Sequence, residues 1–120
     1  MNDRLDFGEA VRAKRMARAA SDPAFSVRKV AARVGIEPSY LSKIERGEQP
    51  PPGEDTIRRI AEELGEDTDE LLALGGKVSG DLLAIIRDRP TLVAELLRSV
   101  RKMSAKRMTE LSRQVRDGDW

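Results

Sequence analysis

The stretch FSVRKVAARVGIEPSYLSKIERG, residues 25–47, decides the fold of this chain. Ser26 is a candidate helix N-cap. The apolar residues that follow recur at the spacing of one helix face: Val27, Val30, Ala31 and Val34. Gly35 comes directly after them, where helices commonly end in a left-handed residue that glycine adopts at little cost. The pattern predicts a short helix that ends at Gly35.

A second short helix is expected after a tight turn. Pro38 suits its first helical position, because the N–H that proline lacks is not needed there. Leu41 and Ile44 form the inner face, and Gly47 ends the helix. The residues left facing outward are Ser39, Tyr40, Ser42, Lys43 and Arg46. Two helices of an ordinary bundle are the alternative interpretation of this pair.

Three further helices are predicted around the pair. One runs from Asp6 to about Ala20, and another from Glu54 to Leu64 with a clean apolar stripe. A third starts at Asp67, whose spacing from Glu70 has the form of a capping box. The glycine pair at 75–76 then marks a boundary. We therefore expect an all-α fold, with a five-helix domain at residues 1–75 and a C-terminal helical region at 76–120.

The composition agrees with an all-helical protein and argues against an enzyme. Charged residues make up 36% of the chain and aromatic residues only 3%, so the core must be built from aliphatic side chains. Cysteine and histidine are absent, which removes disulfides, thiolate metal sites and the commonest general base. We expect no catalytic residues, no metal and no cofactor. We also expect no membrane span or signal peptide, because the N-terminus is polar and long apolar runs are lacking.

Charge is distributed unevenly along the chain. Residues 1–47, 48–81 and 82–120 carry net charges of +4, −7 and +4, which together give the overall +1. The first basic block contains the helix pair, where a phosphate-binding surface would lie. A solvated mixture of charges is the alternative there. The eight Asp and Glu residues between Glu54 and Glu70 are interpreted as a solvated face that DNA avoids, rather than as a metal or catalytic site.

The C-terminal region carries more apolar surface than the first domain can cover. Ser79 is expected to cap a short helix that Arg89-Pro90 breaks. A long helix is then predicted from Thr91 towards Arg116. Exposed apolar patches usually mark an interface. We expect a dimer interface made by Leu82, Leu83, Ile85, Ile86, Leu92, Val93, Leu96, Leu97 and Val100. The last stretch is expected to be either a partner helix or a frayed tail.

The chain resembles the lambda-repressor/Cro type of helix-turn-helix proteins, the XRE family, over roughly residues 7–74. The matching positions are Ser26, Ala31, Gly35-Ile36, Leu41-Ser42, Glu45-Arg46-Gly47, Pro50 and the segment IRRIAEELG. The resemblance implies a buried ion pair between Arg15 and Glu45, although Arg15 is alternatively a surface charge. Two positions depart from the family. Val27 replaces a DNA-contacting glutamine, and Glu37 replaces the usual hydroxyl cap of the recognition helix.

The resemblance also implies which residues meet double-stranded DNA. The recognition helix lies in the major groove, with its N-terminal residues at the base edges. Ser39, Tyr40 and Lys43 are expected to read bases, while Pro38 occupies a base-reading position but has no donor. Packing against the preceding helix is the alternative for Tyr40. The residues expected at the DNA backbone are Arg28, Ser42, Arg46 and Gln49, the last with an alternative base contact.

Two functions are consistent with the sequence. The first is a transcriptional regulator, expected in the cytoplasm and associated with a bacterial or phage nucleoid. In its simplest form it is an autoregulating repressor that binds an inverted repeat as a homodimer. The second is an antitoxin or partner-binding protein, whose C-terminal helices bind a second protein while DNA binding serves autoregulation. An enzyme is disfavoured, because the chain lacks a nucleophile–base set and a glycine-rich phosphate loop.

Overall fold

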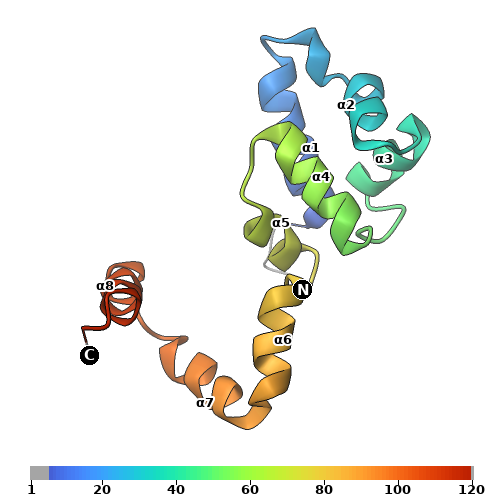
Figure 1. Ribbon diagram of the computed structural model, residues 1–120. Helices are drawn as coiled ribbons and strands as arrows, with labels where there is room; N and C mark the ends of the chain where they lie inside the picture. The colour runs from blue at the N-terminus through green and yellow to red at the C-terminus, as the bar shows by residue number, and fades with distance from the viewer. Residues whose placement is uncertain (1–5, 120) are drawn as a thin grey trace. The chain divides into compact units, whose positions relative to one another are not determined.

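The computed structural model describes residues 6–119. Residues 1–5, which the predicted domain 1–75 includes, and Trp120 lie outside that range. All regular secondary structure in the described part is helical, so the predicted all-α class is confirmed. The chain divides into two compact units, Met1–Ser79 and Gly80–Trp120. The first contains α1 (Phe7–Ala19), η1 (Pro23–Phe25), α2 (Val27–Val34), α3 (Pro38–Glu45), α4 (Glu54–Leu64) and α5 (Thr68–Leu74) (Figure 1).

Short polar side chains cap three helices of the first unit. Asp6 accepts a hydrogen bond from the Gly8 N–H at 3.0 Å, which begins α1. Ser26 accepts from the Lys29 N–H at 3.2 Å, and Asp67 accepts from the Glu70 N–H at 2.9 Å. Each bond satisfies a backbone donor that the first turn of a helix leaves without a partner. These caps fix where α1, α2 and α5 begin.

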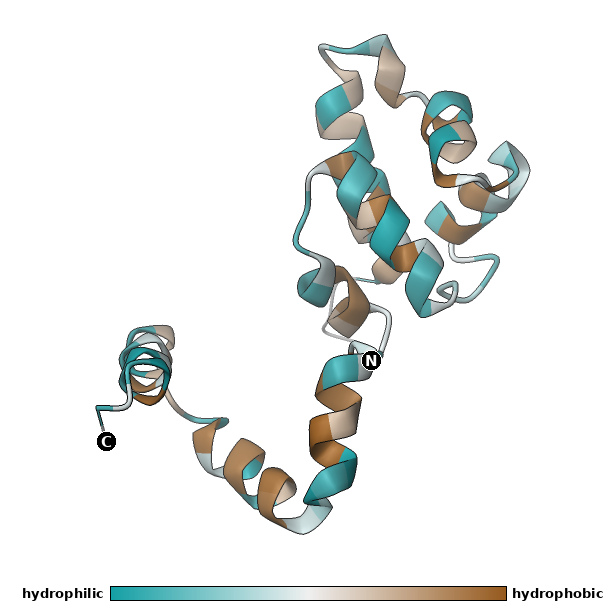
Figure 2. Ribbon diagram, viewed as in Figure 1, coloured by the Kyte–Doolittle hydropathy of each residue, from teal (hydrophilic) through white to brown (hydrophobic). Residues whose placement is uncertain are grey.

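The core of the first unit lies between α1, α2, α3, α4 and α5. Aliphatic residues of these helices form one core cluster, and Figure 2 shows hydrophobic and hydrophilic residues interspersed along the helices of this unit. Full burial of one such side chain contributes on the order of 1.5–3 kcal/mol. The largest fully buried side chains are Val11, Val30, Val34, Leu41, Ile44, Ile57, Ile60, Leu64, Leu71 and Leu72.

Gly8 allows α1 to approach the end of α3 very closely. A Cβ atom at this position would lie 2.1 Å from the carbonyl oxygen of Ile44 and 3.1 Å from that of Glu45. Backbone cannot yield as a flexible side chain can, so any larger residue would push the two helices apart. Gly8 therefore helps to set the position of α3.

The connection between α1 and α2 forms the 3₁₀ turn η1. Asp22 accepts a hydrogen bond from the Ala24 N–H at 2.9 Å and caps the turn. The guanidinium carbons of Arg18 and Arg33 lie 5.4 Å and 5.3 Å from the centroid of the Phe25 ring. Both distances are within the range of a cation–π interaction. The turn thus ties α1 to α2 through one aromatic ring.

A C-terminal capping motif keeps residues 75–77 with the first unit. Gly76 is left-handed, with φ 73°, and the Lys77 N–H donates to the Leu72 carbonyl at 2.8 Å. A Cβ at Gly75 would lie 3.2 Å from Cδ1 of Ile57, so this residue packs against the core. The division between the units accordingly falls after Ser79, whereas the sequence places the boundary after Gly75.

The second unit consists of α6 (Gly80–Asp88), α7 (Pro90–Val100) and α8 (Ala105–Arg116). The predicted long helix from Thr91 to Arg116 is wrong, because the chain leaves the helix between α7 and α8. Ser104 has an extended backbone, with φ −69° and ψ 158°, and its hydroxyl accepts from the Arg107 N–H at 3.1 Å. A serine N-cap competes with helix continuation, and here the cap prevails.

None of the residues in α6, α7 and α8 is buried. The helices α6 and α7 pack against each other, but their large apolar side chains stay open to solvent. Leu92, Leu96 and Leu97 are 61%, 59% and 54% exposed. In the described part of the chain, no helix is long and apolar enough to cross a membrane.

Candidate nucleic-acid interface

The turn between α2 and α3 is fixed by backbone hydrogen bonds. Gly35 is left-handed, with φ 90°, and its N–H donates to the Ala31 carbonyl at 2.8 Å. The N–H of Ile36 donates to the same carbonyl at 3.0 Å. Ile36 then packs against the core, and Pro38 begins α3. The inner faces of α2 and α3 therefore meet in the core and leave the outer face of α3 to solvent.

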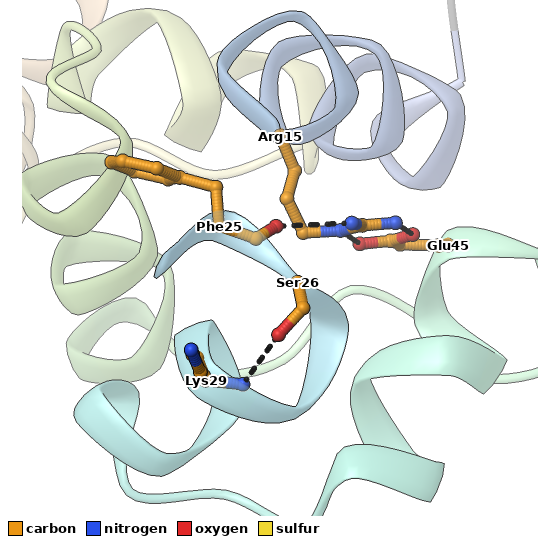
Figure 3. Close-up of polar contacts among 5 residues, drawn as sticks. All are labelled: Arg15, Phe25, Ser26, Lys29 and Glu45. Carbon is orange, nitrogen blue, oxygen red and sulfur yellow. Dashed lines mark hydrogen bonds and ion pairs between the residues drawn. The ribbon is translucent and has the colours of Figure 1, made fainter. Parts of the chain in front are cut away.

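A buried ion pair holds the end of α3 against α1. Nε of Arg15 donates to Oε2 of Glu45 at 2.7 Å, and Nη2 donates to Oε1 at 2.9 Å. A third bond runs from Nη1 of Arg15 to the Phe25 carbonyl at 3.2 Å (Figure 3). The residues are only 8% and 5% exposed. The pair therefore joins α1, η1 and α3, and losing one partner would leave a buried charge.

The residues expected to read bases lie on the outer side of α3. Pro38, Ser39 and Lys43 are exposed. Tyr40 is half-buried and packs against the core, so the packing interpretation accounts for part of its ring. Glu37 stands at the N-cap position but makes no side-chain capping bond, which leaves its carboxylate facing solvent. A short outer face of α3 is thus available to a groove of DNA.

Residues expected at the DNA backbone come before, within and after α3 in the chain. Arg28 is exposed on the first turn of α2, and Ser42 is half-buried on α3. Gln49 is exposed in the loop after α3, and its N–H donates to the Lys43 carbonyl at 3.3 Å. Phosphate contacts from such residues would position the protein on DNA without reading sequence.

A polar hollow adds a residue that sequence reasoning missed. Its lining residues are Arg12, Arg15, Val27, Ser42, Glu45 and Arg46. Because Arg15 and Glu45 neutralise each other, Arg12 and Arg46 supply the net positive charge of this hollow. Arg12 lies one turn before Arg15 on α1, and this spacing on one helix face could have indicated that the two share a side.

Arg46 has a carboxylate partner that the sequence analysis did not consider. Its Nε donates to Oε2 of Glu48 at 2.7 Å, and its Nη2 donates to Oε1 at 3.3 Å. The hydrogen bonds from Arg46 hold the pKa of Glu48 below its usual range, and the charge of Lys43 acts in the same direction. Glu48 likewise raises the pKa of Arg46. Both side chains remain solvent-exposed.

Part of the acidic surface of the first unit takes part in ion pairs. Lys14 contacts Glu66 at 2.8 Å and Glu70 at 3.6 Å. These carboxylates hold the pKa of Lys14 above its usual value, with the hydrogen bond to Glu66 as the largest cause. Within residues 6–119 no group of three or more His, Cys, Asp or Glu side chains is arranged to hold a metal ion.

A short helix, a left-handed glycine turn and a second helix with an open polar face together define a helix-turn-helix module of DNA-binding regulators. The comparison with protein families agrees with that class. The chain belongs to the helix-turn-helix domain family, whose model matches residues 6–74. Neither the curated proteins nor the solved structures gave a match to this chain.

Proposed function

We propose that this protein is a sequence-specific transcriptional regulator that binds an inverted-repeat operator as a homodimer and represses its own promoter. A single helix-turn-helix module contacts only a few base pairs, so two-fold pairing is the simplest way to extend the site. The observation that carries the dimer is the second unit, which exposes large aliphatic side chains and buries none.

The expected dimer interface lies on α6 and α7. Five of its residues are exposed: Leu82, Ile85, Leu92, Leu96 and Leu97. The other four are half-buried: Leu83, Ile86, Val93 and Val100. Full burial of a fully exposed aliphatic side chain contributes on the order of 1.5–3 kcal/mol, and these side chains, which are already partly covered, would each contribute roughly half of that. Association costs between about 4 and 15 kcal/mol, so a stable dimer requires that most of these side chains in both copies are buried together.

The end of α7 and the inner side of α8 extend this apolar surface. A hollow there is lined mainly by apolar side chains: Val100, Met108, Leu111, Ser112, Val115 and Arg116. In the proposed dimer, aliphatic side chains of the second copy fill it. Pairing of this kind would give α8 a role as a partner helix rather than a frayed tail.

Substitutions in the full-length chain test the dimer. Leu96→Asp should convert a dimer to a monomer in sedimentation experiments, because it places a charge within the apolar surface. Ser99→Asp on the same helix is the matched control, since Ser99 is exposed and polar. A dimer that persists in Leu96→Asp would place the interface elsewhere, for example on α5 or the loop at residues 50–53.

Footprinting on the promoter beside the gene tests the DNA-binding part of the proposal. A symmetric dimer should protect two half-sites whose centres lie about 10–10.5 bp apart or a multiple of this spacing. A reporter driven by that promoter should be less active when the protein is present. A single asymmetric site would contradict the dimer model, and an unchanged reporter would contradict repression.

The same exposed helices favour a second candidate function. An antitoxin or other operon partner-binding protein would use α6 to α8 to bind a second protein, and its DNA binding would serve autoregulation. Purification from the native host followed by mass spectrometry distinguishes the two. A stoichiometric second protein lost in Leu96→Asp and kept in Ser99→Asp would support this second function.

A further inference from the structure

The loop after α3 places Glu48 in a defined position beside the recognition helix. Gly47 is left-handed, with φ 77°, and turns the chain back on itself. The Gly47 N–H donates to the Ile44 carbonyl at 3.0 Å, and the Glu48 N–H donates to the Lys43 carbonyl at 2.8 Å. The backbone of Glu48 is therefore anchored to α3, and its side chain starts from a fixed point.

From that point the carboxylate of Glu48 contacts the guanidinium of Arg46 with both oxygens, at 2.7 Å and 3.3 Å. This two-oxygen arrangement is also the one in which arginine binds a phosphate group. Arg46, with a smaller contribution from Lys43, holds the pKa of Glu48 below its usual range, so both cations favour the charged carboxylate. Glu48 thus interacts with both cations that α3 directs towards the expected DNA side.

Arg46 also lines the polar hollow that contains Arg12 and Ser42. A phosphate at this hollow would meet a hydroxyl and two guanidinium groups, one of which already holds a carboxylate. Glu48 occupies the edge of the guanidinium formed by Nε and Nη2. A phosphate that binds this same edge must displace the carboxylate, because each N–H there donates to one anion, so DNA and Glu48 compete for that edge of Arg46.

We propose that Glu48 occupies on Arg46, in the free protein, the position that a DNA phosphate takes in the complex, and so lowers the affinity for every duplex. This inference rests on the proposed DNA-binding function. Binding exchanges the carboxylate for a phosphate and leaves the Glu48 charge beside the DNA backbone. The cost is independent of sequence, because it involves no base edge. This cost of displacing Glu48 opposes the electrostatic attraction to DNA, which dominates non-specific binding in a genome with many competing sites.

The test is the affinity of the full-length protein for a random-sequence duplex, measured by fluorescence anisotropy over a range of salt. Glu48→Gln should bind about two- to fivefold more tightly per subunit, as expected for the loss of one exposed ion pair. The log–log salt slope should become steeper by up to roughly 0.9 per subunit, because a displaced Glu48 carboxylate no longer takes up a cation while the phosphate releases one.

The matched control is Asp69→Asn on α5, which removes an equal charge from an exposed site in the acidic part of the unit. The double variant Arg46→Gln with Glu48→Gln separates competition from a general charge effect. Relative to Arg46→Gln alone, the double variant should gain less affinity than Glu48→Gln gains over the wild-type protein, because only the repulsion between the Glu48 carboxylate and the DNA backbone is then removed.

An equal gain with and without Arg46 would overturn the competition model, and so would unchanged binding in Glu48→Gln while the wild-type protein binds duplex. If the wild-type protein and all variants fail to bind duplex, the proposed function itself fails. Thermal unfolding of each variant checks that the exposed substitutions leave the fold intact.

Discussion

The two units use similar aliphatic residues with opposite results. In the first unit, Leu41, Ile60 and Leu64 are fully buried, because helices cover them from several sides. In the second unit, Leu92 and Leu96 lie on a helix of comparable length and stay more than half exposed. Apolar spacing along a helix therefore predicts which face avoids water, but it does not tell whether the chain itself covers that face. In the proposed function, the first unit stabilises itself, whereas the second gains its stability by contact with another molecule.

The largest expected change in unfolding free energy is at the buried ion pair of the first unit. Glu45→Ala leaves Arg15 buried without its carboxylate and should lower the free energy of unfolding by about 3–5 kcal/mol. Chemical denaturation monitored by circular dichroism measures this. Glu66→Ala on the surface, where the carboxylate pairs with Lys14, is the control and should have a much smaller effect. Equal losses in the two variants would show that burial does not set the strength of the Arg15–Glu45 contact.

A matched pair of leucine substitutions tests the comparison directly. Leu64→Ala should cost about 2–5 kcal/mol of unfolding free energy at any protein concentration, because it opens a cavity in the core. Leu92→Ala should leave unfolding almost unchanged at low concentration and weaken stability only where the protein is associated. Denaturation at two widely separated protein concentrations distinguishes these responses. A concentration-independent loss in Leu92→Ala would mean that the second unit has a core of its own.

The smallest of these effects concerns the break between α7 and α8. Ser104→Ala removes the capping bond to the Arg107 N–H and should destabilise α8 by about 1 kcal/mol. Amide hydrogen exchange should show faster exchange at the start of α8, with α4 as the internal reference. Ser112→Ala, within the same helix, is the control. Unchanged exchange in Ser104→Ala would favour a continuous helix from α7 into α8.

Much of the first unit could be predicted because its signals are local. The Ser26 and Asp67 caps and the left-handed Gly35 follow from residue type and spacing, and the structure contains each of them. The family resemblance pointed to Arg15 and Glu45, which the structure places together. These features depend on neighbours a few residues away, or on positions that the family pattern brings into register.

The features that were missed depend on contacts between distant segments, or on two local conformations of similar free energy. The need for glycine at residue 8 arises from a backbone atom of Ile44, which periodicity cannot reveal. The Phe25 ring lies close to the guanidinium groups of two arginines from different helices. The helix break at Ser104 reflects competition between a cap and a continuing turn, and the residues around it suit either state. The pairing of Arg46 with Glu48 depends on the reversal of the chain at Gly47.

The close contact at Gly8 has a consequence for engineering. The position of α3 is fixed by contacts on its inner face. These are the backbone of α1, the Arg15–Glu45 pair and the buried residues Leu41 and Ile44. The side chains of Ser39 and Lys43 are exposed on the outer face and do not belong to these contacts. These two residues are among those expected to read bases, so libraries at residues 39 and 43 should yield new operator preferences without redesign of the scaffold that presents them.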